Sequence, residues 1–302
     1  MRTDFPLAFG CMQFGGRADE AASRAMYDMA RAAGIVEFDT AFGYTDGASE
    51  RLLGRFARGD DAVRIATKVG YEGGAGRANL AAQFSQSLQR LGVERVDLLY
   101  LHRFDPATSL DETFSLFAEW QQAGRIARIG VSNFAAWQVM KAQAVLARFG
   151  SRVDVIQPMY NLVKRQAEVE ILPMCADQGI AVRAYSPLGG GLLTGKYAGG
   201  QGGRLVEDAR YRARYAPPAM HEAAAGLAAL AAEVGVHPAT LAVAWVMGCP
   251  VAPVIPLISA RDAEQLAPSL AAAGFAMDAA LRARLTALFP APPPATDRIE
   301  EA

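Results

Sequence analysis

Eight short apolar runs alternate with longer helical patterns along the whole chain. The runs are almost continuously hydrophobic, which is typical of parallel strands buried on both faces. They are LAFGC (7–11), VEFDT (36–40), RIATKV (64–69), DLLYLH (97–102), RIGVSN (128–133), VIQPMY (155–160), AVRAYSPL (181–188) and VAPVIPLI (251–258). Eight strand–helix alternations without a boundary linker favour one (β/α)8 TIM barrel over two doubly wound domains.

Amphipathic stretches fill the gaps between the apolar runs. Examples are DEAASRAMYDMARAAG (19–34) and ANLAAQFSQSLQRLG (78–92). Several of these patterns end at a glycine: Gly34, Gly92, Gly124 and Gly179. Because glycine adopts the left-handed conformation that closes many helices, we expect helix ends there.

Two segments break this rhythm. Residues 196–220 form a connection that is too long and polar for a simple turn, and such loops are often functional covers. The last residues, 290–302, are Pro-rich and then acidic, which predicts an extended or disordered tail. We therefore expect a barrel domain over residues 1–289 followed by this tail.

The overall composition excludes several classes of protein. The 302 residues are 52% hydrophobic and carry a net charge of −1, so nucleic acid and anionic membranes are not expected partners. The three cysteines are far apart and no metal-ligand spacing occurs, so we expect neither disulfides nor a bound metal. No apolar run approaches the roughly 20 residues of a membrane helix, and no signal peptide is evident. These features predict a cytoplasmic protein.

Four polar residues lie at or just beyond the ends of consecutive apolar runs. Asp39, Lys68 and His102 end the runs VEFD, RIATK and DLLYLH, and Tyr44 follows five residues after Asp39. Because parallel strands of a barrel end at the same rim, we expect these side chains to converge. A carboxylate, a phenol, an ammonium and an imidazole in one cleft form a proton-transfer site.

The chemistry of this tetrad indicates a general acid. A Lys near a Tyr lowers the pKa of the phenol from about 10 towards neutrality, because a positive charge favours the phenolate. Asp39 would keep Lys68 charged and oriented, and His102 could hydrogen-bond a carbonyl or relay the proton. Tyr44 would then protonate a carbonyl during its reduction. In the alternative interpretation, Asp39 and Lys68 form a structural ion pair and the two rings are neighbours with satisfied hydrogen bonds.

The segments around the tetrad resemble the aldo-keto reductase family. Matching segments occur in the family's order from about residue 7 to 270: FDTAFGYTDGASERLLG (38–54), SLQRLGVERVDLLYLH (87–102), GRIARIGVSNF (124–134), VIQPMYN (155–161), AYSPLGGGLLTGKY (184–197), and PATLAVAWVMGCP followed by PLISARDAEQL. The resemblance implies reversible reduction of an aldehyde or ketone to an alcohol. The hydride would come from nicotinamide C4 and the proton from Tyr44.

The resemblance also implies a nicotinamide cofactor bound without a Rossmann domain. Three matching residues, Ser132, Asn133 and Gln157, would hold the carboxamide, and Tyr185 would stack on the nicotinamide ring. The Gly-rich segment with Lys196 would approach the pyrophosphate, and Arg261 the 2′-phosphate, which favours NADPH with NADH possible. The remaining matching cofactor residues are Ser186, Pro187, Leu188, Gly190, Leu192, Ser259 and Gln265.

Some positions depart from the family pattern. Ser259 replaces a usual Gly, and Pro268-Ser269 replaces the Glu-Asn pair that usually contacts adenine. Gly43, Gly70 and Arg103 stand where steroid-converting members carry large apolar groups, so the small-molecule carbonyl site should be roomier and more polar. The predicted substrate pocket contains Phe14, Phe42, Arg103 and Phe104. Arg103 could meet a carboxylate or phosphate, or point into solvent.

Two other functional classes stay open at this point. The potassium-channel β subunits resemble this family and keep both tetrad and cofactor, yet serve mainly as sensors with little turnover. A barrel enzyme of unrelated chemistry, such as an isomerase, would bind no nicotinamide. The sequence determines neither the physiological substrate nor the oligomeric state.

Overall fold

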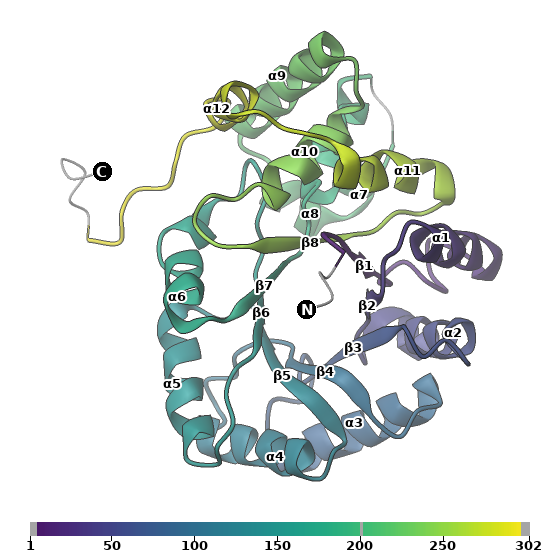
Figure 1. Ribbon diagram of the computed structural model, residues 1–302, viewed down its shortest axis with the longest axis vertical. Coiled ribbons are helices and arrows are strands. Elements are labelled where there is room, and N and C mark those ends of the chain that lie inside the picture. Colours follow the sequence, from purple (N-terminus) through teal and green to yellow (C-terminus); the bar gives the residue numbers. More distant parts are fainter. Residues whose placement is uncertain (1–4, 200–201, 297–302) are drawn as a thin grey trace.

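The computed structural model describes residues 5–199 and 202–296. Its eight strands form one closed parallel barrel in which each strand pairs with its neighbours along the chain and β8 pairs with β1. The strands are β1 Ala8–Gly10, β2 Glu37–Asp39, β3 Arg64–Val69, β4 Val96–Leu101, β5 Ile126–Ser132, β6 Val155–Gln157, β7 Ala181–Ala184 and β8 Val254–Ile258. The predicted (β/α)8 barrel is confirmed (Figure 1).

α-Helices surround the barrel (Figure 1), and in the described part of the chain one α-helix follows each of the first six strands and four lie between β7 and β8. The helices are α1 Glu20–Ala32, α2 Ala48–Phe56, α3 Arg77–Leu91, α4 Leu110–Gln122, α5 Ala136–Ala147, α6 Ile171–Gln178, α7 Arg204–Glu207, α8 Ala209–Arg214, α9 Pro218–Val234, α10 Pro238–Met247, α11 Ala263–Ala271 and α12 Ala279–Thr286. Gly92 and Gly179 cap α3 and α6 in the left-handed conformation, as expected. Gly34 and Gly124 follow the caps of α1 and α4, also with positive φ.

Five strands, β1, β2, β6, β7 and β8, are shorter than the apolar runs that predict them, and β6 and β7 lose the most residues at their carboxyl ends. β6 ends at Gln157 because Pro158 has no N–H with which to continue the ladder. β7 ends at Ala184, and two residues later Ser186 has a φ of 57°, which is incompatible with a strand. The residues that follow both strands are thus released into loops at the carboxyl rim.

The long connection 196–220 is more ordered than a loop. Lys196–Gly199 forms a 3-10 turn, α7 and α8 follow, and α9 begins at Pro218. The Tyr197 hydroxyl accepts a hydrogen bond from the Leu205 N–H (3.1 Å), which joins the turn to α7. Residues 200–201 lie outside the described part. Of the predicted tail, 290–296 contains neither helix nor strand and extends away from α12 (Figure 1), and 297–302 lies outside the described residues.

The barrel interior is filled by a small cluster around Tyr100. Tyr100 is fully buried, and a Cβ atom built on Gly130 of β5 would lie 2.4 Å from its ring. Below Asp39 on β2, Glu37 forms a buried ion pair with Arg183 of β7 at 2.7 Å. The ring at the centre of the barrel therefore depends on the absence of a side chain at position 130.

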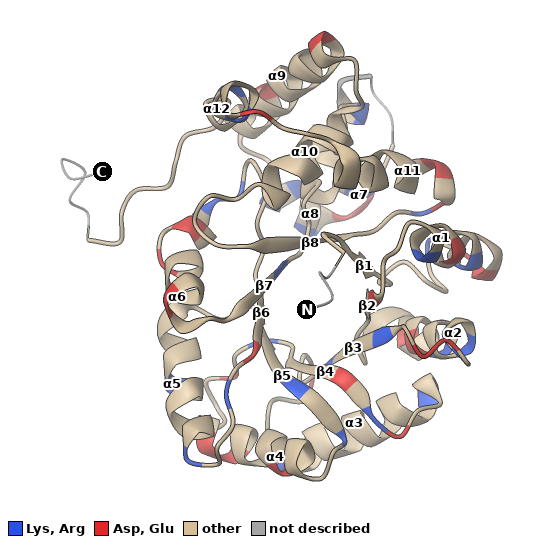
Figure 2. Cartoon of the chain, in the orientation of Figure 1, with Lys and Arg blue, Asp and Glu red and all other residues tan. Residues whose placement is uncertain are grey.

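Charged residues of both signs are interspersed over the outer helices (Figure 2). Among the described helices, none alone is long and apolar enough to cross a membrane. The pair α9 and α10 passes by length and composition together, but the two helices bend by 101° at their junction.

Candidate active site

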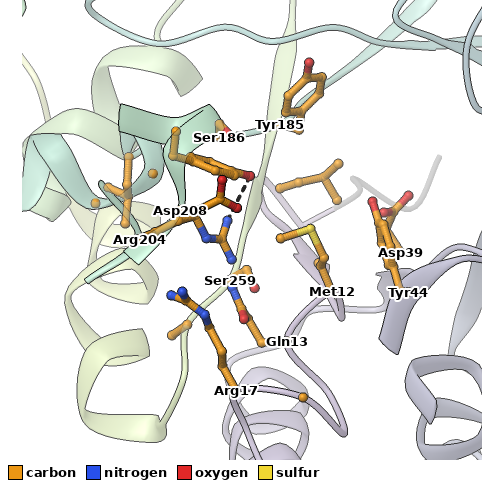
Figure 3. A pocket seen from close by; sticks show the side chains of 18 of the residues that line it. Met12, Gln13, Arg17, Asp39, Tyr44, Tyr185, Ser186, Arg204, Asp208 and Ser259 are labelled. Atoms are coloured by element: carbon orange, nitrogen blue, oxygen red, sulfur yellow. Dashed lines mark hydrogen bonds between the residues drawn. The ribbon is translucent and has the colours of Figure 1, made fainter. Parts of the chain in front are cut away.

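A cavity of about 1440 Å³ opens at the carboxyl rim of the barrel. Each of the eight strands contributes lining residues from its end or from the loop after it. Asp39 and Tyr44 lie at one end of this cavity, and Arg17 and Arg204 lie at the other (Figure 3). In TIM barrels the loops at this rim carry the chemistry, so this cavity is the candidate active site.

Lys68 and Asp39 form a buried ion pair at the base of the cavity. The Lys68 ammonium contacts the Asp39 carboxylate and donates to the Thr40 carbonyl at 2.9 Å. Burial disfavours the charged ammonium, but Asp39 and Tyr44 outweigh it and raise the pKa of Lys68. Lys68 is therefore cationic at neutral pH.

Tyr44 begins a tight turn, Tyr44–Gly47, between β2 and α2. Thr45 and Asp46 have left-handed φ angles of 48° and 50°. The Thr45 hydroxyl donates to the Phe14 carbonyl at 2.8 Å and accepts from the Ser49 N–H at 3.0 Å, which holds this conformation. The turn places the Tyr44 ring centroid 5.1 Å from the Lys68 ammonium.

The predicted decrease in the phenol pKa is not found. Burial raises the pKa of Tyr44 above its ordinary value, and Lys68 opposes the rise without reversing it. The physical reason is that Asp39 already compensates much of the Lys68 charge, while the cavity deprives a phenolate of water. Tyr44 keeps its proton at neutral pH, as a proton donor must.

His102 follows β4 and faces Tyr44 edge-on, with ring centroids 5.9 Å apart. Burial, together with the charges of Lys68 and Arg103, lowers the pKa of His102 to about 3. The imidazole is thus neutral, with one ring nitrogen as donor and the other as acceptor. The four tetrad side chains are brought together as their positions in the sequence predicted.

A second group of predicted residues connects to this tetrad. The Asn133 side chain donates to the His102 carbonyl at 2.9 Å and accepts from the Tyr185 hydroxyl at 2.8 Å. Gln157 donates to the second carboxylate oxygen of Asp39 at 2.9 Å, and Ser132 donates to the Gln157 carbonyl at 2.9 Å. The amide side chains at the ends of β5 and β6 are therefore oriented by the same network as the ion pair.

Most of the other predicted cofactor residues also line the cavity. The Ser259 hydroxyl is buried and has no hydrogen-bond partner among the described residues. Arg261 is exposed, and Asp262 caps α11 by accepting from the Gln265 N–H at 2.8 Å. The lining includes Ser132, Asn133, Gln157, Tyr185, Ser186, Pro187, Leu188, Gly190, Lys196, Ser259, Arg261 and Gln265.

Three predicted site residues do not line the cavity. Phe14 is fully buried in the core, where its ring packs against Phe9 and Phe56 at 5.5 and 5.9 Å. Phe104 turns away to pack against Phe134 at 5.6 Å. Leu192 is buried in the hydrophobic core. In each case apolar packing draws the side chain off the cavity wall, whereas Phe42 and Arg103 remain in it.

Several lining residues were not predicted. Met12, Gln13 and Arg17 come from the loop after β1 (Figure 3), and Tyr71 comes from the loop after β3. Arg210, Tyr211 and Arg214 come from the stretch RYRARY (210–215), and this cluster of Arg and Tyr residues in the long connection could have indicated a binding surface. His237, which the sequence left unassigned, also lines the cavity, although its Nδ1 accepts from the Ala239 N–H to cap α10.

A buried network supports the Tyr44 turn from below. Glu50 is fully buried, accepts from the Thr67 hydroxyl at 2.7 Å and pairs with Arg90 at 3.3 Å. Arg90 also donates to the Phe42 carbonyl at 2.8 Å. Among the described residues no group of three or more His, Cys, Asp or Glu side chains could hold a metal ion.

The chain is similar in sequence to several known proteins. A family model described as the aldo/keto reductase family matches residues 6–289. The chain is 40% identical over 200 residues to aflatoxin B1 aldehyde reductase member 2 of Mus musculus, which covers 62% of this chain and 53% of that protein. It is 34% identical over 215 residues to an uncharacterized oxidoreductase of Bacillus subtilis, covering 68% and 62% of the two chains. With L-glyceraldehyde 3-phosphate reductase of Escherichia coli it shares 36% identity over 135 residues, covering 44% and 38%.

The chain spans a little more than half the length of the aflatoxin B1 aldehyde reductases it matches. The family match, in contrast, covers nearly the whole described barrel. On this evidence the chain belongs to the aldo/keto reductase family.

Proposed function

We propose that the protein reduces an aldehyde or ketone to an alcohol, reversibly, with a nicotinamide dinucleotide. The observation that carries the proposal is the juxtaposition of the Lys68–Asp39 ion pair with Tyr44 and the neutral His102. The printed names of two relatives, an aflatoxin B1 aldehyde reductase and an L-glyceraldehyde 3-phosphate reductase, support reduction of a carbonyl group.

The residues of the cavity fit such a dinucleotide. Asn133 and Gln157 carry both donors and acceptors, as recognition of a carboxamide requires. The Ser259 hydroxyl has no hydrogen-bond partner among the described residues, so it can bond to the dinucleotide. Arg17, Lys196 and Arg261 line the cationic end of the cavity and can meet phosphates, so we favour NADPH while leaving NADH possible.

The mechanism follows from the charges of the tetrad. A bound reduced nicotinamide would supply the hydride for the carbonyl carbon. Tyr44 transfers its proton to the carbonyl oxygen, and Lys68 stabilises the phenolate that remains. His102 donates a hydrogen bond that orients the same oxygen. Asp39 holds Lys68 in place and keeps it charged throughout.

The test is steady-state turnover of the purified protein with NADPH and, separately, with NADH against a panel of aldehydes. Loss of absorbance at the nicotinamide band together with alcohol formation supports the proposal. Tight cofactor binding in a fluorescence titration without turnover would instead indicate a sensor protein. Absence of binding by either cofactor would overturn the oxidoreductase assignment.

A further inference from the structure

We propose that Arg103 and Tyr71 form a subsite for an anionic group on the carbonyl substrate, so that aldehydes bearing a carboxylate or phosphate are preferred. The inference deepens the proposed carbonyl reduction and depends on it for its catalytic readout. Both residues line the cavity beside His102, at the end opposite Arg17 and Arg204.

The position of the guanidinium group is set by stacking. The Arg103 guanidinium carbon lies 4.8 Å from the Tyr71 ring centroid, and the Tyr71 ring lies 4.8 Å from that of His102. The guanidinium and the imidazole can therefore be no further apart than twice that distance. A short or aromatic aldehyde can reach both groups at once, with its oxygen at His102 and its anion at Arg103.

The stacking partner is itself held in place. Gln83 accepts from the Gly70 N–H at 2.8 Å and donates to the Glu72 carbonyl at 3.0 Å, so it holds the backbone on both sides of Tyr71. Gln83 is almost fully buried. The backbone that carries Tyr71 is therefore fixed where its ring can stack on Arg103, even though the residue is 44% exposed.

The charge of Arg103 is available to a ligand. Among the described residues it takes part in no hydrogen bond or ion pair. The nearby Asp105 carboxylate is already engaged by the Ala75 N–H at 2.8 Å, the Ala107 N–H at 3.0 Å and the Thr108 hydroxyl at 2.7 Å. A planar guanidinium without a carboxylate partner is suited to bidentate recognition of a carboxylate or phosphate.

One acidic side chain, Glu72, also lines this end of the cavity. It is exposed and belongs to the same loop as Tyr71. The negative charge of Glu72 repels an anionic substrate. Removing this charge should therefore change the substrate preference in the direction opposite to the removal of the Arg103 charge. Glu72→Gln should strengthen the preference for anionic aldehydes, and Arg103→Met should weaken it.

The experiment compares matched pairs of substrates that differ in the anion. For carboxylate the pair is 4-carboxybenzaldehyde and methyl 4-formylbenzoate, and for phosphate it is glycolaldehyde phosphate and glycolaldehyde. The readout is the ratio of kcat/KM within each pair, at low salt because an exposed charge is screened. The variants are Arg103→Met, Arg103→Lys and, as a charge-matched control, Arg58→Met, which alters an exposed residue outside the cavity lining.

We expect the wild type to favour one or both anionic members by about tenfold, a value typical of a partly exposed charge-assisted contact. Arg103→Met should bring the ratio close to one, Arg103→Lys should leave an intermediate ratio, and Arg58→Met should leave it unchanged. Whichever pair shows the preference identifies carboxylate or phosphate as the group bound.

Equal ratios in the wild type and in Arg103→Met would overturn the subsite while leaving carbonyl reduction intact. If none of the four aldehydes is reduced although the cofactor binds, no ratio can be formed, and the subsite is tested by binding alone. Calorimetric binding of 4-carboxybenzaldehyde to the wild type and to Arg103→Met then decides the subsite alone, and equal affinities would overturn it.

Discussion

The Tyr44 phenol experiences two opposing influences on its pKa. Burial favours the neutral phenol, and the Lys68 ammonium, centred 5.1 Å from the ring, favours the phenolate. Because Asp39 compensates Lys68, the neutral form prevails in the resting protein. The same ammonium remains available to stabilise the phenolate once the proton has left.

Tyr44→Phe should therefore abolish carbonyl reduction while leaving cofactor affinity nearly unchanged. We expect kcat to fall at least about 100-fold, the usual contribution of a positioned acid. Tyr27→Phe is the matched control, because it also removes one buried hydroxyl but lies outside the cavity lining. Full activity of Tyr44→Phe in a steady-state assay would eliminate the proton-donor assignment.

The low pKa of His102 predicts a pH dependence of stability. The pKa of His102 is about 3 in the folded protein, below its ordinary value of 6.5. Between pH 6.5 and pH 3, therefore, the imidazole binds a proton in the unfolded chain but not in the folded chain. Stability contributed by neutral His102 is thus present above pH 6.5 and lost on acidification, by about 2 kcal/mol at pH 5. Urea unfolding at pH 7 and pH 5 should show a smaller loss in His102→Asn, and parallel curves would contradict the prediction.

At the scale of elements, the contact between α2 and α3 positions the turn that carries Tyr44. The buried Glu50 of α2 pairs with Arg90 of α3, which also donates to the carbonyl of Phe42, two residues before Tyr44. A Cβ atom built on Gly54 would lie 2.1 Å from the Leu91 carbonyl oxygen, so the helices approach as closely as their backbones allow. These contacts join the segment before Tyr44 to α3 and hold it at the rim of the barrel.

Arg90→Met should destabilise the protein by about 3 kcal/mol, because it leaves the Glu50 carboxylate buried without its partner. The double variant Arg90→Met/Glu50→Gln should recover part of that loss. Urea unfolding measures both. Equal stabilities of the single and double variants would show that the Glu50 charge is not what makes the single substitution costly.

The sequence predicts the strands and the position of the tetrad, but not the pKa of Tyr44 or the orientation of Phe14. The barrel follows from eight almost continuously apolar runs that alternate with helical patterns, and the convergence of the tetrad follows from the shared rim of parallel strands. The phenol pKa could not be read in the same way, because it depends on the balance of burial against a paired charge. The orientation of Phe14 was also unreadable, since an aromatic residue near a strand end can face either the core or the cavity.

Across the whole molecule, the cationic end of the cavity is assembled from distant parts of the chain. Arg17 in the loop after β1 forms an ion pair with Glu207 of α7 at 2.6 Å, and Arg261 precedes α11. Asp262 already caps α11 with a carboxylate, which offsets the positive end of that helix. We therefore expect that the Arg261 side chain, and not the end of α11, would recognise an additional phosphate at this position.

Arg261→Ala should weaken NADPH binding by about 1.5 kcal/mol and leave NADH binding almost unchanged. The value is at the low end for a charged hydrogen bond because Arg261 is exposed. Fluorescence titrations with both cofactors measure the difference, with Arg58→Ala as the control for net charge. Equal weakening of both cofactors would mean that Arg261 does not distinguish them.

The close contact between the Tyr100 ring and Gly130 restricts the order in which these two positions can be substituted. Any substitution at position 130 places a side chain against a fully buried ring, whereas a smaller residue at position 100 first creates space. A variant with a small residue at position 100 and a large residue at position 130 can therefore be reached by only one order of substitutions. Tyr100 must be replaced by a smaller residue before Gly130 is replaced by a larger one. In a library built on this chain, folded intermediates should carry two small residues at positions 100 and 130 and never two large ones.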